Sequence, residues 1–87
     1  MTPTPNEIAE SARLKSEKNP ALAGALRDLW NAIRVEIEAS VAANGSPNGA
    51  YFRQTRCRAA RLEFLTAFLE DATPAECTAR ARKAGGL

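Results

Sequence analysis

Apolar side chains recur at helical spacing throughout residues 20–43. At about 100° per residue they fall on one face of a helix, and charged side chains lie opposite or alongside them. A helix of this length spans about 36 Å, which suits one arm of a hairpin of two long helices. The apolar stripe consists of Leu22, Leu26, Leu29, Trp30, Ile33, Ile37 and Val41.

A second apolar stripe predicts another long helix over residues 48–72. The preceding helix is expected to end at Asn44-Gly45, because glycine readily takes the left-handed conformation that closes a helix. The flanks of the NGSPNG linker do not alternate apolar and polar residues, so a β-hairpin is not predicted. The stripe contains Phe52, Cys57, Ala60, Phe64, Ala67 and Phe68, flanked by Leu62, Leu65 and Leu69.

Four capping residues followed by proline indicate where helices begin. Proline at the first helical position loses no hydrogen bond, and the side-chain oxygen before it accepts from an amide of the first turn. Glu7 and Glu76 complete two of these sites as capping boxes. The sites are Thr4-Pro5, Asn19-Pro20, Ser46-Pro47 and Thr73-Pro74. They predict helices over residues 5–18, 20–43, 48–72 and 74–84.

These elements predict one small all-α domain over residues 1–87. Two long antiparallel helices form its centre, with a short helix at each terminus. A domain of this size buries only about 60% of its unfolded surface, and the first helix offers few apolar side chains. The stripe on helix 20–43 exceeds what such a hairpin covers, so we expect a homo-oligomer. Its interface would contain Leu26, Leu29, Trp30, Ile33 and Ile37.

The composition offers no catalytic or metal-binding signature. The chain has no histidine and therefore lacks the usual general base near neutral pH. Cys57 and Cys77 are twenty positions apart, without the spacing of metal ligands. A disulfide between them and two free thiols remain alternatives. Neighbouring arginines are expected to lower the pKa of Cys57, yet no base accompanies it. We expect no enzyme activity and no cofactor.

The N-terminal residues MTPTPNEIAE have neither the basic region nor the apolar region of a signal peptide. No apolar run approaches the 18 residues that a membrane helix requires. We therefore expect a cytoplasmic protein that does not bind membranes.

Positive charge is concentrated in the second half of the chain. Residues 1–48 carry five basic and six acidic side chains, whereas residues 49–87 carry seven basic and four acidic ones. The stretch YFRQTRCRAARLE, residues 51–63, holds four of these arginines and no acid before Glu63. Helical geometry places Arg53 and Arg61 on or beside the apolar stripe, where an unpaired charge is costly.

Three interpretations of the arginines remain open. In the first, the arginine side chains extend along the apolar surface or pair with acids of a neighbouring helix. Glu36 is then a candidate partner of Arg61 or Arg53. Alternatively, they bind a phosphate-bearing anion, because the guanidinium fork matches phosphate and the adjacent aromatic rings can stack on a base. A third interpretation is contact with nucleic acid. The anion site would contain Tyr51, Phe52, Arg53, Arg56 and Arg61.

The order of aromatic, arginine and proline residues within residues 20–74 is similar to that of a known group of proteins. Phe52 and Arg53 open the second long helix, Phe64 follows about three turns later, and Ala72-Thr73-Pro74 closes it. This layout resembles the small phage proteins that sequester cyclic nucleotide signals of bacterial immunity. The resemblance implies an oligomer that binds its ligand between subunits. The basic segment after Pro74 and the glycine-rich turn depart from the family pattern.

The sequence thus favours a non-enzymatic helical binding protein that sequesters an anionic, cyclic nucleotide-like ligand in a homo-oligomer, in a phage counter-defence role. Two alternatives remain. The protein acts as an inhibitor or adaptor through a helical surface that binds another protein. Otherwise it is an accessory factor that binds nucleic acid, whose affinity would fall steeply with salt.

Overall fold

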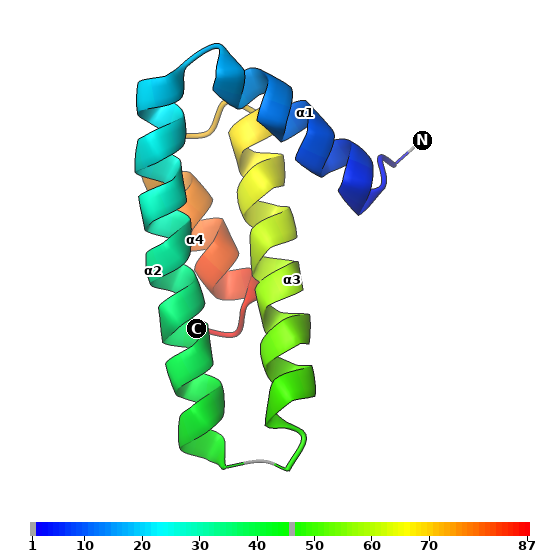
Figure 1. Ribbon diagram of the computed structural model, residues 1–87, viewed down its shortest axis with the longest axis vertical. Coiled ribbons are helices and arrows are strands. Elements are labelled where there is room, and N and C mark those ends of the chain that lie inside the picture. Colours follow the sequence, from blue (N-terminus) through cyan, green and yellow to red (C-terminus); the bar gives the residue numbers. More distant parts are fainter. Residues whose placement is uncertain (1, 46) are drawn as a thin grey trace.

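The computed structural model describes residues 2–45 and 47–87, which form four helices and no strand. In Figure 1, α2 and α3 lie side by side and run in opposite directions, with α4 behind them. The short α1 lies across the end of the pair where α2 begins and α3 ends. The all-α prediction is confirmed. The helices are α1 (Pro5–Glu17), α2 (Pro20–Asn44), α3 (Gly49–Leu69) and α4 (Pro74–Ala84).

None of these helices, within the residues that the structure describes, combines the length and apolarity that a bilayer crossing requires.

The predicted caps start three of the helices. The side chains of Thr4, Asn19 and Thr73 each accept a hydrogen bond of 3.2 Å from the amide three residues further on. The predicted starts of α1, α2 and α4 are therefore confirmed. The fourth predicted cap, Ser46, lies outside the described residues. The helix that follows it begins at Gly49, so Pro47 is not its first residue.

Two left-handed residues end the long helices. Gly45 has a φ of 60° and closes α2 after Asn44, which confirms the predicted end at Asn44-Gly45; the helix is one residue longer than the predicted range 20–43. Asp71 has a φ of 62° and closes α3. The amide of Ala72 donates to the carbonyl of Ala67 at 3.0 Å, which is the backbone pattern of a Schellman motif. This motif ends α3 at Leu69, so the prediction that it continues to residue 72 is wrong.

The cap of α4 provides a test of how firmly this helix is docked. Thr73→Ala removes the oxygen that accepts from the Glu76 amide. We expect it to lower the free energy of unfolding by about 1 kcal/mol. Thr55→Ala, on the exposed surface of α3, is the matched control and should change stability little. Urea unfolding followed by circular dichroism measures both; equal stability of the Thr73 variant and the wild type would show that α4 is not docked.

The apolar stripe of α2 is covered within one chain. Ile37 is 0% exposed and Ile33 is 2% exposed, and both belong to the core that α2 forms with α3 and α4. Leu26 is also buried, while Leu29 and Trp30 pack against the core at its edge. An oligomer is therefore not needed to cover these five residues, because α3 and α4 already pack against this face of α2 within one chain. Association of copies through another surface stays a prediction.

Small residues let α4 approach this closely. Cys77 and Ala81 are both 0% exposed in the contact between the helices. A Cβ atom on Gly85 would lie 2.8 Å from Cδ1 of Ile37 and 3.1 Å from Cβ of Ala60. Only glycine fits there without a shift of the packed side chains.

Ion pairs fix the outer face of α4. Arg80 contacts Glu63 at 2.6 Å and Glu70 at 2.7 Å, both on or directly after α3. Arg82 pairs with Glu36 of α2. The expectation that Glu36 pairs with Arg61 or Arg53 is wrong, because the docked α4 places Arg82 against it.

Candidate functional site

The arginines of α3 point to different sides of the helix. At about 100° per residue, Arg56 lies about 60° from Arg53 in one direction and Arg61 about 80° in the other. Phe52 lies on the same side as Arg56, and Tyr51 lies nearly opposite Arg53. The structure therefore does not bring the five predicted ligand-binding residues together in one site.

Arg56 holds the C-terminal end of α4. Its Nε donates to the carbonyl of Gly85 at 2.7 Å, and its Nη2 donates to that of Gly86 at 3.3 Å. Its Nη1 donates to Oγ of Ser40 on α2 at 3.3 Å. A cation at a helix C-terminus satisfies carbonyls that have no partner in the helix and complements its dipole. The donors of Arg56 thus hold three helices together, and its role in binding a ligand stays a prediction.

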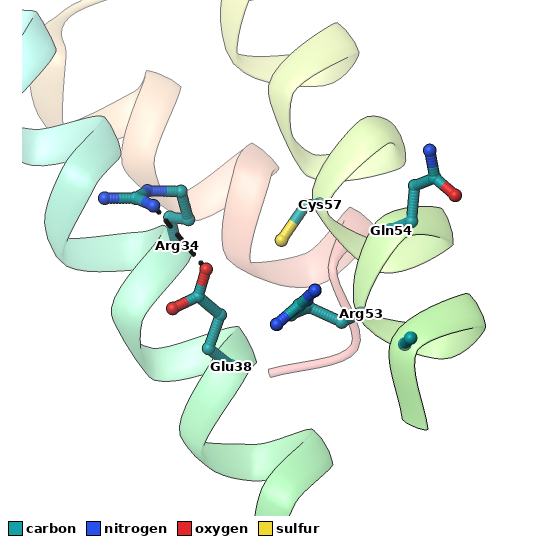
Figure 2. A pocket seen from close by; sticks show the side chains of 6 residues that line it. Arg34, Glu38, Arg53, Gln54 and Cys57 are labelled. Carbon is teal, nitrogen blue, oxygen red and sulfur yellow. Dashed lines mark ion pairs between the residues drawn. The ribbon is translucent and has the colours of Figure 1, made fainter. Parts of the chain in front are cut away.

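Arg53 lies instead in an open groove between α2 and α3, on the side away from α4. We call this the arginine groove; its volume is about 560 Å³. Figure 2 shows Arg53 and the Cys57 thiol extending from α3 toward α2, whereas Gln54 points away. The groove is lined by Arg34, Glu38, Ala50, Arg53, Gln54 and Cys57.

The charge on Arg53 is not neutralised by the described part of the chain. No carboxylate among those residues lies within 4 Å of its guanidinium, and no hydrogen bond engages it there. Ala50, in the first turn of α3, also lines the groove. Amides of a first helical turn have no acceptor within the helix, and the helix dipole adds positive potential at that end. Both features favour an anion beside Arg53.

On the α2 side of the groove, Arg34 and Glu38 form an exposed pair. Their closest atoms, Nη1 and Oε1, are 3.5 Å apart, and the side chains are 47% and 40% exposed. A solvent-exposed pair with this geometry contributes about 0–1 kcal/mol. An incoming anion can therefore replace the Glu38 carboxylate at Arg34 at small cost. Glu38 is the one acid among the described residues that line the groove.

Cys57 is not an activated nucleophile. Burial raises the pKa of its thiol above the ordinary value, and the nearby Glu38 raises it further. Three arginines around it lower the pKa, but by less in total. The expectation that the arginines lower this pKa is wrong, because the sequence shows the charges but not the burial. Cys57 and Cys77 are both free thiols, so the disulfide alternative is excluded.

The two aromatic residues before Arg53 lie outside the arginine groove. Tyr51 is 66% exposed and Phe52 is 45% exposed. Their rings contact each other edge to face, with centroids 5.7 Å apart. They form a separate exposed patch at the start of α3, so the structure does not place them against a ligand held by Arg53.

Arg34 and Glu38 on α2 were not predicted as site residues, and only Arg53, on the α3 side of the groove, was. Arg27 and Arg34 are seven residues apart, and Glu38 follows four residues later, so all three lie along one flank of the apolar stripe. This spacing could have predicted that Arg34 and Glu38 lie together beside the contact between the two long helices. The fifth predicted residue, Arg61, lies about two helical turns beyond Arg53 and lines a different cavity.

No protein family, curated protein or solved structure matches this chain. Within the described residues, no group of acids and cysteines is arranged to hold a metal ion.

Proposed function

We propose that this chain is a non-catalytic cytosolic binding protein that holds a small phosphate-bearing anion in the arginine groove. The observation that carries the proposal is Arg53, which extends into the groove beside the first turn of α3 with no carboxylate partner among the described residues. Arg34 supplies a second cation from α2 once the anion displaces Glu38. Two guanidinium forks from facing helices suit the several oxygens of a phosphate group.

The proposed ligand class is a nucleotide with one or more phosphate groups. The resemblance to the phage proteins that sequester cyclic nucleotides motivates cyclic dinucleotides and trinucleotides as the first candidates. By binding a cyclic nucleotide of this kind, the protein would keep that immune signal from its receptor, which is a counter-defence role. The proposal also includes a homo-oligomer. Static light scattering at tens of micromolar protein measures the molecular mass and tests the oligomer separately from ligand binding.

A thermal melt with such ligands tests the groove. A ligand present at 100 times its Kd stabilises the folded state by about 2.7 kcal/mol. In a domain of this size, that raises Tm by about 10 °C or more. We expect Arg53→Ala and Arg34→Ala to abolish the shift. Glu38→Gln should enlarge it, because Arg34 is then free to meet the ligand.

Arg58→Ala is the matched control, since Arg58 is an exposed arginine of the same helix that does not line the groove. It should keep the full shift. An equal loss in the Arg53 and Arg58 variants would show that only net charge matters. A wild-type Tm that no phosphate-bearing ligand moves would contradict the proposal.

A second candidate function is binding to another protein through the outer face of α3. Tyr51 and Leu62 are 66% and 37% exposed and eleven residues apart, so they lie on one face. Arg58 lies between them on that face. A tyrosine and an arginine on one helical surface are residue types that are enriched in contacts covered by another protein, and the exposed leucine beside them adds apolar area. Tyr51→Ala and Leu62→Ala should abolish such binding and leave the ligand-induced thermal shift intact.

A further inference from the structure

A second cavity opens between α1, α2 and α3 on the same side of the hairpin, nearer the end that α1 covers. Its volume is about 170 Å³. Its apolar lining consists of three aromatic residues, Trp30, Phe64 and Phe68, and three aliphatic ones, Ala23, Leu26 and Leu65. Trp30 and Leu65 are half-buried, whereas Leu26, Phe64 and Phe68 are buried and form the floor. Rings of Trp30 and Phe64 are tilted by 57°, with centroids 6.1 Å apart. We call this cavity, which is open to solvent on one side, the aromatic pocket.

Two arginines stand beside the aromatic pocket, one on each long helix. Arg27 of α2 and Arg61 of α3 both line it, and neither forms an ion pair or hydrogen bond with another described residue. None of the described lining residues is acidic. The nearby Lys15 is engaged elsewhere, because its ammonium lies over the Phe68 ring and pairs with Asp71 at 2.6 Å. The pocket therefore combines an apolar interior with unpaired positive charge.

We propose that the aromatic pocket binds a small aromatic carboxylate. The ring lies against the half-buried Trp30 and Leu65, with the buried Phe64 beneath it, and it packs edge to face with the Trp30 ring. The carboxylate lies toward Arg27 and Arg61 and accepts hydrogen bonds from their planar guanidinium groups in bidentate geometry. A neutral ring would leave both guanidinium groups without a partner, and inorganic phosphate would leave the apolar walls in water. The site shares no lining residue with the arginine groove, so it goes beyond the proposed function.

Trp30 reports directly on this site, because it is the one tryptophan of the sequence and forms part of the wall. The experiment titrates the full chain with benzoate and with phenylacetate while recording tryptophan emission, at matched ionic strength with sodium chloride as the reference. Ligands this small bind in the millimolar range, so the titration extends to about 20 mM. We expect a saturable change in emission with both carboxylates and a much weaker response to benzamide, which has the ring without the charge.

Arg61→Gln and Arg27→Gln should each weaken benzoate binding by about tenfold, because each removes a charge-assisted hydrogen-bonding partner. Arg58→Gln, outside the pocket, should bind as the wild type does. Arg53→Ala should also bind benzoate normally, which separates failure of this proposal from failure of the arginine groove. Circular dichroism establishes that each variant is folded, and their exposed positions favour that outcome.

Three results would overturn the proposal. One is the absence of any saturable change in Trp30 emission. Another is benzamide binding as tightly as benzoate, which would identify an apolar cavity with no use for the arginines. The third is an emission change that follows protein concentration without ligand, which would show that a second copy of the chain occupies the pocket.

Discussion

Ile33→Asp is expected to unfold the chain. Ile33 is 2% exposed in the core between α2 and its neighbours, and the described residues include no buried polar or charged side chain. A carboxylate there would be buried without a partner, which costs several kcal/mol even after the surroundings relax. At about 0.05–0.15 kcal/mol per residue, a domain of 87 residues has a total stability of about 4–13 kcal/mol. Loss of most helical circular dichroism at 25 °C is therefore the expected result.

Val35→Asp is the control in the same helix, because Val35 is 57% exposed. The substitution is chemically similar, yet the new carboxylate stays in water. Its melting curve should lie close to that of the wild type. The pair also tests the original expectation of an interface at Ile33. If Ile33→Asp instead converted an oligomeric wild type into a folded monomer, α4 would not cover this stripe in solution.

Arg56→Ala is expected to lower the free energy of unfolding by about 2–3 kcal/mol. The change removes three hydrogen bonds from one guanidinium to the end of α4 and to Ser40. Hydrogen bonds to a charged group contribute more than neutral ones, and the carbonyls of Gly85 and Gly86 lose their partner. α4 should then detach more readily from α2 and α3. Urea unfolding and amide hydrogen exchange across residues 74–84 measure the effect.

Arg58→Ala again serves as the comparison, because it removes the same charge from an exposed position of α3 and should change stability by less than about 0.5 kcal/mol. This experiment decides between two roles for Arg56. In a site made of clustered arginines, removing one relieves repulsion, and stability stays equal or rises. That outcome would favour Arg56 as one of the ligand-binding residues.

The helices and their ends were largely predictable from local sequence. Each of the caps Thr4, Asn19 and Thr73 acts on an amide three residues away, so no distant part of the chain is needed to form it. Gly45 ends α2 for an equally local reason. The end of α3 was missed because Asp71 takes a left-handed conformation that is usual for glycine and less common for aspartate.

The roles of the arginines were not predictable in the same way. Arg53, Arg56 and Arg61 look equivalent in the sequence, yet Arg56 binds the end of α4 while the other two lie beside separate cavities. The difference depends on where the end of α4 docks, because the carbonyls that Arg56 binds lie 29 and 30 residues further along the chain. The pKa of Cys57 was misjudged for a related reason, because burial arises only when α3 packs against its neighbours.

The sequence by itself determined the number, type and approximate limits of the described helices, because hydrophobic periodicity and capping act over a few residues. Only the tertiary structure decided that α4 covers the stripe of α2, since small residues such as Cys77 and Gly85 permit a close approach that no periodicity reveals. Packing also decided which arginines form hydrogen bonds or ion pairs within the fold and which line the arginine groove and the aromatic pocket without a partner among the described residues. Charge pairing between helices depends on their relative positions, and those are set by contacts far apart in the chain.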